Sequence, residues 1–215
     1  MCTRTDIRKY FTECVADPAE IYNRVISAML SKGLYIRPPY IPVPENIDFA
    51  KKQSYLSGFL GKQRPLNSIE ISHLFSELQR NLQRNAMCIG FSQVARSEQV
   101  QRYMEKGKEI ASIHVKTFSS LLMNNNLPVS MTWDSGVTES KISPFSDKLM
   151  MQQIRSSNVV LSASYGRALS VVRHDLMVVF LQLQAEILKF LEDGLKIIIE
   201  NGWFEKPPQA KEHLH

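Results

Sequence analysis

Apolar residues recur at three- and four-residue steps through most of the chain, which is the period of an amphipathic α-helix. Residues 68–95 follow this period closely, and residues 97–124 carry an inner face that is nearly a heptad. Residues 175–201 show an apolar arc of roughly half the circumference at 100° per residue. A fourth segment opens at Ser143–Pro144 or Ser146 and ends near Val172. It is rich in small residues and has almost no charge between Leu149 and Tyr165 apart from Arg155. Such a composition favours a helix buried on several sides.

The joins between these four helices predict the fold. A short join, a long connection without helical period over residues 126–143, and a second short join are typical of ferritin-like proteins. We therefore expect an all-α protein, a ferritin-like four-helix bundle with a long crossover. An extra N-terminal helix over residues 3–32 and a proline-rich strap over residues 36–46 precede it, and a short helix is expected within residues 47–60. Pro18 predicts a kink or break in the first helix near Ala16–Asp17.

The two ends of the chain share a faint repeat with a constant offset of 169 positions. The matching positions are Arg4 and Arg173, Asp6 and Asp175, Gly33 and Gly202, and Pro38–Pro39 and Pro207–Pro208. Asp favours a helix start, Gly takes the left-handed position after a helix, and Pro prevents its continuation. We interpret residues 1–46 as the last helix and strap of a truncated first repeat. Residues 47–208 form a complete helical-bundle repeat, and residues 209–215 a tail.

Composition narrows the classes of partner. The net charge of +5 is spread over scattered basic residues, which indicates a mixed-charge surface and no nucleic-acid partner. Three distant cysteines match no zinc spacing, and no signal peptide is visible, so a cytoplasmic location is expected. The longest apolar run, Leu176–Leu181, is too short for a membrane span.

Ferritin-like bundles often hold two metals with inward-pointing Glu residues and Glu-x-x-His pairs. The chain has one such pair, Glu70 with His73. At 100° per residue, Glu70, His73 and Glu77 share a stripe with Arg80 and Arg84, which the pattern places away from the apolar face. The fourth helix has no Glu at all, so a complete di-iron set is absent. Glu70, His73 and His114 remain the candidate metal ligands.

His114 lies on an inner seam between Ala111 and Phe118. It is either a ligand or acid–base group, or a neutral core histidine hydrogen-bonded to a hydroxyl. The hydroxyl donors expected for the second reading are those of Ser162, Ser164 and Tyr165, because an unpaired buried polar group is costly. No phosphate loop, Gly-x-Ser-x-Gly or Cys–His–Asp spacing is present, and Cys88 fits core packing. We expect no catalytic residue, no cofactor and no enzyme activity.

Several stretches together resemble one family. They are residues 32–42, 64–67, 70–75, 131–134, 143–151 and 201–203, with Pro128 and the Pro207–Pro208 pair. The chain is similar to a two-repeat family of unknown function from spore-forming bacilli, whose members are described as spore coat proteins of the coat-protein-F type. The resemblance implies a ferritin-like helical bundle in each repeat and no assigned reaction. The chain departs from the two-repeat pattern of the family in one respect, since most of the first repeat is missing here.

These observations lead to one hypothesis and one alternative. The first is a non-enzymatic structural or assembly protein, associated with the spore coat, that acts through helix-packing surfaces. Its expected partners are further copies of itself or other coat and assembly proteins. The alternative is a metal-binding ferritin-like protein with an atypical site near His73 or His114.

Overall fold

A computed structural model describes residues 2–59 and 63–210 of the chain. Within these residues it contains five α-helices, two short 3-10 helices and no strand, so the prediction of an all-α protein is confirmed. The α-helices are α1 (Thr5–Ser31), α2 (Ser68–Val94), α3 (Glu98–Met123), α4 (Asp147–Ala168) and α5 (His174–Glu200), and the 3-10 helices are η1 (Gln53–Leu56) and η2 (Asp134–Gly136). None of the described helices carries an apolar stretch long enough to cross a membrane.

The chain divides into two compact units, Met1–Pro38 and Pro39–His215. The first unit contains α1, and the second contains α2 to α5. The last residue of the predicted short helix, Leu60, and the tail residues 211–215 lie outside the described residues.

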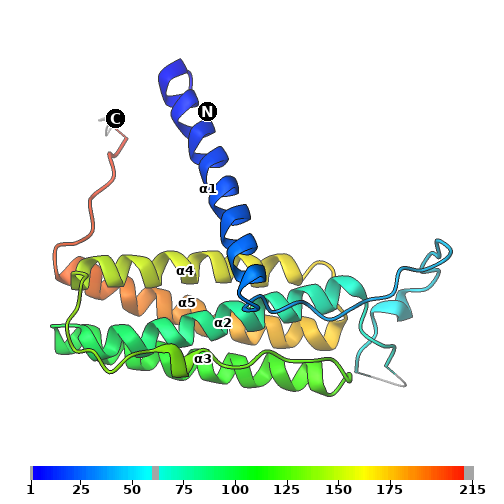
Figure 1. Cartoon of the computed structure of the whole chain (residues 1–215). Coiled ribbons are helices and arrows are strands. Elements are labelled where there is room, and N and C mark those ends of the chain that lie inside the picture. The colour runs from blue at the N-terminus through cyan, green and yellow to red at the C-terminus, as the bar shows by residue number, and fades with distance from the viewer. Residues whose placement is uncertain (1, 60–62, 211–215) are drawn as a thin grey trace, which may run out of the picture. The chain divides into compact units, whose positions relative to one another are not determined.

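In the second unit α2 packs against α3 and α4, and α5 packs against α4 and α3 (Figure 1). The connection after α3 returns along the helices before α4 begins, so α3 and α4 run in the same direction (Figure 1). The long connection is therefore a crossover, as the spacing of the helices predicts. The four helices enclose large, fully buried side chains, among them Leu74, Phe118, Ile154, Phe180 and Phe190.

Side chains of α2 bind the crossover at two successive points. The Gln79 amide donates a hydrogen bond to the Ser130 hydroxyl. One turn and a half later, Asn85 Nδ2 donates to Asp134 Oδ1 of η2 at 2.8 Å. The crossover is thus fixed along α2 and covers a third side of that helix, beside α3 and α4.

The structure differs from two predictions about the N-terminal third: the first helix is not broken at Pro18, and the short helix after the strap is not formed as predicted. The helix α1 runs without a break from Thr5 to Ser31 and contains Pro18 in its interior. Proline removes one backbone hydrogen bond, to the carbonyl four residues earlier, and the helix on both sides is long enough to continue. The predicted short helix within residues 47–60 is reduced to the single 3-10 turn η1.

Gly194 of α5 leaves room for the Tyr103 side chain of α3. A Cβ atom at this position would lie 2.6 Å from Cζ of Tyr103, whose hydroxyl donates a 3.0 Å hydrogen bond to the Phe190 carbonyl. We expect Gly194→Ala to lower the free energy of unfolding by about 1–3 kcal/mol, because the buried Tyr103 ring has to shift. Urea denaturation followed by circular dichroism measures this.

Gly90 of α2 provides the matched control for this prediction. A Cβ atom there would make only an ordinary contact, 3.7 Å from Val137. Gly90→Ala is therefore expected to raise the free energy of unfolding by about 0.4–1 kcal/mol through helix propensity and lost freedom of the unfolded chain. Equal effects of the two substitutions would contradict the steric explanation.

Candidate functional site

Polar side chains occupy the middle of the α2–α5 interior, between apolar layers. Helix α2 contributes Glu77, Asn81 and Arg84, which are all buried. Further buried polar groups come from the facing helices, among them His114 of α3, and Asn158, Ser164 and Tyr165 of α4. Buried polar groups are costly unless they are hydrogen-bonded, so this interior network is the first candidate for a functional site.

A chain of hydrogen bonds through His114 joins all four helices. Asn81 Nδ2 donates to the Tyr165 hydroxyl oxygen at 2.8 Å, and that hydroxyl lies 3.0 Å from His114 Nδ1. His114 Nε2 lies 3.1 Å from Glu186 Oε2 on α5. Because the Tyr165 oxygen accepts from Asn81, its own proton points to Nδ1. His114 therefore carries its proton on Nε2 and donates it to Glu186.

The surroundings of His114 keep it neutral. Burial, together with the positive charge of Arg84, lowers its pKa to about 4, although the hydrogen bond with Glu186 acts in the opposite direction. Burial also raises the pKa of Tyr165 far above its ordinary value. Both groups are fully buried, so neither can reach a substrate as an acid or base in this conformation. The geometry matches the reading of His114 as a core histidine bonded to a hydroxyl.

Glu77 and the α2 arginines form the second part of the network. Glu77 Oε1 accepts hydrogen bonds from Arg80 Nη1, at 2.6 Å, and from the Ser164 hydroxyl. Burial raises the pKa of Glu77, and these two partners offset only part of that effect. Arg84 Nη1 donates to Asn158 Oδ1 at 2.6 Å. Among the described residues, Glu77 Oε2, Asn81 Oδ1 and two further nitrogens of Arg84 have no hydrogen-bond partner.

The predicted orientation of the α2 stripe is wrong. Glu70 and Glu77 are 0% exposed and Arg84 is 3% exposed, whereas the helical wheel places them away from the core. The physical reason is the number of neighbours: α3, α4 and the crossover together cover most of the circumference of α2. A buried arc of that width includes positions on both sides of the apolar face.

Glu70 is the centre of a separate group of ion pairs and hydrogen bonds, where the loop before α2 meets the loop before α5. We call this group, formed by Arg64, Asn67, Glu70 and Arg173, the clamp. Glu70 Oε2 accepts from Arg64 Nη1 at 2.7 Å and from the Asn67 backbone N–H at 2.9 Å. Its Oε1 accepts from Arg64 Nη2 and from the Arg173 backbone N–H, both at 2.8 Å. A carboxylate has about four acceptor positions, so all of them are occupied. Glu70 also completes the capping box of α2 with Asn67.

The clamp holds the Glu70 carboxylate in its charged form. Burial alone would raise its pKa, but the hydrogen bonds from Arg64 and from the two backbone N–H groups outweigh burial and lower the pKa. Arg173 continues the clamp, since its guanidinium pairs with Asp175 and donates to the Arg64 carbonyl. A carboxylate with this many donors is a structural centre of the fold and is not available to a metal ion.

The three candidate metal ligands do not converge. Glu70 is engaged in the clamp, both ring nitrogens of His114 are hydrogen-bonded, and His73 is half-buried on α2. Burial and the nearby charges of Arg167 and Arg80 lower the pKa of His73, and such charges also repel a cation. In the described part of the chain, no three His, Cys, Asp or Glu side chains gather in a way that could hold a metal.

Burial raises the pKa of the Cys88 thiol to about 12, so this cysteine is not an activated nucleophile.

Sequence reasoning missed Arg84, Asn81 and Asn158 as site residues. A signal was present, because Glu77, Asn81, Arg84 and Cys88 recur at three- and four-residue steps between the apolar positions of α2. Only a helix that is covered on several sides makes such a polar row internal.

Comparison with known proteins relates this fold to one family and one solved structure. The sequence model of a family of proteins of unknown function, DUF3231, matches residues 1–47 and 54–215. No curated protein matches the chain. The crystal structure of a "putative spore coat protein" from Bacillus halodurans has a TM-score of 0.63 and 15% sequence identity, and the match covers 69% of this chain and 98% of that one. At 15% sequence identity, this similarity shows a shared fold and nothing further.

Proposed function

The chain belongs to the DUF3231 family of proteins of unknown function, and we propose that it is a non-enzymatic assembly protein that acts through helix-packing surfaces. The single observation that carries this proposal is the apolar face of α1, which the described residues of its own unit, Met1–Pro38, do not bury. We also propose that α2–α5 form a ferritin-like four-helix bundle, and that α1 corresponds to the last helix of a second, equivalent bundle.

The helices α1 and α5 support this equivalence by their local structure. Their bounds, Thr5–Ser31 and His174–Glu200, are displaced by the same 169 positions as the sequence repeat. Each helix is followed by a glycine in the left-handed region, Gly33 at φ 65° and Gly202 at φ 69°. Beyond each glycine the chain makes the same capping bond, Leu34 N to Met29 O at 2.8 Å and Trp203 N to Ile198 O at 2.9 Å.

The starts of the two helices also correspond. Arg4 Nε donates to Asp6 Oδ1 at 3.1 Å, and Arg173 Nε donates to Asp175 Oδ1 at 3.0 Å. In the second unit this arginine is buried against Arg64, whereas in the first unit Arg4 is exposed. Among the described residues of the first unit, the two clamp residues of a bundle helix are therefore present without the partner residues that complete the clamp.

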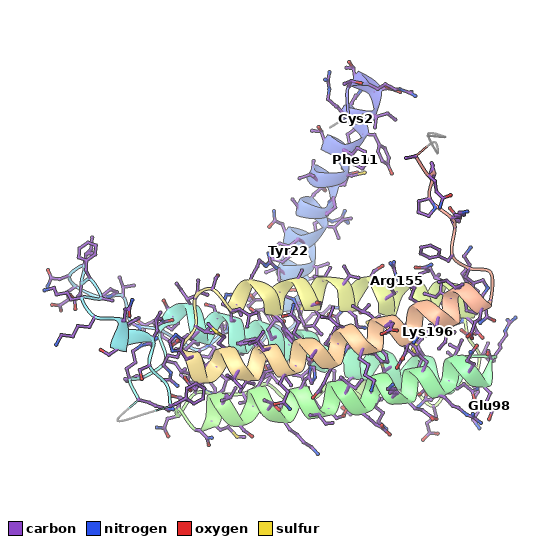
Figure 2. The ribbon with its side chains drawn as sticks, turned by 180° about the vertical axis from the view of Figure 1, so that it is seen from behind. Cys2, Phe11, Tyr22, Glu98, Arg155 and Lys196 are labelled. Carbon is purple, nitrogen blue, oxygen red and sulfur yellow. The ribbon has the colours of Figure 1, made fainter. Side chains whose placement is uncertain are left out.

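The inner face of α5 predicts the contact face of α1. The buried residues of α5 are Leu176, Phe180, Leu183, Ile187, Phe190, Gly194 and Ile198. The positions of α1 at the same offset are Ile7, Phe11, Cys14, Pro18, Ile21, Val25 and Met29, and all of them are apolar. None of them is buried, and Figure 2 shows Phe11 extending from α1. We name these seven positions the α1 face. A contiguous exposed apolar face of this kind marks an interaction surface.

We propose that further copies of this chain cover the α1 face, so that the protein forms a homo-oligomer. The fold shared with the Bacillus halodurans protein is the reason to propose association with the spore coat. The buried and neutral state of His114, and the unreactive Cys88 thiol, support a role without catalysis. Detection of the protein in coat extracts of spores from its own host tests the proposed association.

Substitution of the α1 face is expected to dissociate the oligomer. Light scattering on the full chain should give a mass that is a multiple of 24.6 kDa. The double variant Phe11→Lys with Ile21→Lys should reduce that mass to one chain, because two buried charges without partners oppose association. The matched control is Ala16→Lys with Asn23→Lys, at positions equivalent to the exposed Ala185 and Glu192 of α5. The control adds the same charge to other sides of α1 and should leave the oligomer intact.

Two outcomes would contradict the proposal. One is a wild-type chain that remains a monomer at concentrations of tens of micromolar, which lies in the ordinary range for weak assembly. The other is an equal effect of the two double variants, since that would trace dissociation to net charge and not to the α1 face.

A further inference from the structure

Helix α5 carries a second row of apolar residues on the side away from its buried face. The row follows the alternating three- and four-residue steps of a heptad pattern between residues 178 and 199. Four of its members are between 48% and 54% exposed, namely Val178, Leu181, Leu188 and Ile199. We name the apolar members of the row the α5 stripe: Val178, Leu181, Ala185, Leu188, Leu195 and Ile199. A contiguous exposed apolar surface of this kind indicates an interaction surface.

Basic residues border the α5 stripe on both sides. On one side, Lys189 and Lys196 each follow a leucine of the stripe in sequence, and both are exposed. On the other side lies α4, where Arg155 shares a helix face with Ser162, whose carbonyl oxygen accepts a 3.2 Å hydrogen bond from Gln184 of α5. Figure 2 shows Arg155 on α4 and Lys196 on the adjacent α5. The stripe is therefore an apolar surface between two basic borders.

The single acidic residue within the heptad row does not cancel this charge. It is Glu192, and its Oε1 lies 2.9 Å from Nζ of Lys196. Lys189 and Arg155 therefore leave the borders with a net positive charge. A partner of the α5 stripe is expected to be an apolar helix face with acidic residues beside it, because charge complementarity selects partners at an interface.

The α1 face has a matching spacing and an acidic side. Its members recur at three- and four-residue steps from residue 7 to residue 29, so both apolar rows are about three heptads long. At 100° per residue, Glu13, Asp17 and Glu20 lie together on one side of this face, and all three are exposed. Two of these acids have a base of α1 at 3.9 Å, Lys9 and Arg24. Such exposed pairs contribute little, so they do not prevent a contact with another chain.

Two α5 stripes are poorer partners for each other. If they were packed together, the basic borders of the two copies would meet, and like charges at an interface oppose association. The α1 face would instead place its acidic side beside a basic border. Charge therefore favours α1 of another copy as the occupant of the α5 stripe.

We propose that the α1 face of one copy packs against the α5 stripe of the next copy. This inference rests on the proposed assembly through α1, and it adds the surface to which α1 binds. The two surfaces are different, so the contact is heterologous, and every copy offers one of each. A heterologous contact repeats from copy to copy and builds a ring or a filament.

Light scattering on mixed variants of the full chain tests this pairing. The stripe variant, Leu181→Lys with Leu188→Lys, should have the mass of one chain, as expected for the α1 variant, Phe11→Lys with Ile21→Lys. Mixed in equal amounts, the two should give a mass of two chains of 24.6 kDa each and no larger species. The stripe variant supplies an intact α1 face and the α1 variant an intact α5 stripe, so one contact forms and no third chain can join.

The matched control for the stripe variant is Ile113→Lys with Ser120→Lys on α3. Both positions are exposed, and their spacing of seven residues equals that of Leu181 and Leu188. The control adds the same charges to another helix of the bundle and should keep the wild-type mass. Leu181 and Leu188 are about half exposed, so the stripe variant should retain the fold, which thermal melting followed by circular dichroism checks.

Charge reversal at the border gives a second test that does not touch the apolar residues. Lys189→Glu with Lys196→Glu should raise the dissociation constant at least about tenfold at low salt, because acidic residues of α1 would then meet like charges. The effect should shrink at high salt, where exposed charges are screened. The control is Lys108→Glu with Lys116→Glu on the exposed side of α3, which should leave the dissociation constant unchanged.

The outcomes separate this inference from the proposed function. If the α1 variant dissociates while the stripe variant keeps the wild-type mass, assembly through α1 stands and the pairing with α5 is overturned. A mixture of two dissociated variants that stays at the mass of one chain also overturns the pairing. If the α1 variant keeps the wild-type mass, both proposals fail, and dissociation of the stripe variant in that case would show that copies meet through α5 alone.

Discussion

Replacing Glu70 by alanine is expected to lower the free energy of unfolding by about 3–5 kcal/mol, which is the usual effect of removing one partner of a buried ion pair. The substitution leaves the Arg64 guanidinium without its carboxylate, and it leaves the backbone N–H groups of Asn67 and Arg173 without an acceptor. These donors connect the start of α2 with the start of α5, so their loss acts on two helices at once. Urea denaturation monitored by circular dichroism gives the free energy.

The control for this prediction is Glu98 at the start of α3. Glu98 also pairs with an arginine, Arg102, but its side chain is 75% exposed. Glu98→Ala should change the free energy of unfolding by less than about 0.5 kcal/mol, because exposed ion pairs contribute little. Glu70→Gln should fall between wild type and Glu70→Ala, since it retains part of the hydrogen bonding. A Glu70→Ala protein within about 1 kcal/mol of wild type would refute the clamp as a major source of stability.

Acid is expected to destabilise the protein through His114. In the folded chain its pKa is about 4, whereas an unfolded histidine titrates near about 6.5. Between these values the unfolded chain binds a proton that the folded chain does not, so stability falls as the pH falls. The stability is fully present above about pH 6.5, and about 3 kcal/mol is lost by pH 4.

The groups that face His114 determine this window. Arg84 of α2 opposes protonation by its charge, Glu186 of α5 favours it, and Tyr165 of α4 donates a hydrogen bond to the neutral ring. The lowered pKa of His73 contributes in the same direction, and the raised pKa of Glu77 in the opposite one. A variant at His114 is therefore required to separate its contribution.

Free energies of unfolding measured from pH 7.5 to pH 4 test the assignment. His114→Gln should remove most of the loss between pH 6.5 and pH 4, whatever its effect on stability at neutral pH. The control is His174→Gln, at an exposed position in the first turn of α5, and it should retain the wild-type dependence. An unchanged slope in His114→Gln would show that another group causes the acid sensitivity.

Local signals in the sequence determined the helices and their ends. The apolar period of residues 68–95 and 175–201 predicts α2 and α5 to within one or two residues. The glycines Gly33 and Gly202 mark helix ends because a residue without Cβ takes positive φ readily. The crossover also follows from the sequence, since residues 126–143 are the one long connection without helical period between the four helices of the second unit. Helix period and helix ends are set by residues that lie within a few positions of one another in the sequence, so they can be read from the sequence.

The tertiary structure alone decided which polar groups are internal. One helical wheel cannot show how many neighbours a helix has, and α2 has α3, α4 and the crossover around it. This is why Glu70, Glu77 and Arg84 are buried although the apolar face of α2 does not include them. The partners of His114 likewise come from three other helices, and those helices meet only in the folded chain. The sequence alone specifies the long helices α2 to α5 and the glycines that follow α1 and α5, while burial and charge pairing depend on contacts between distant positions.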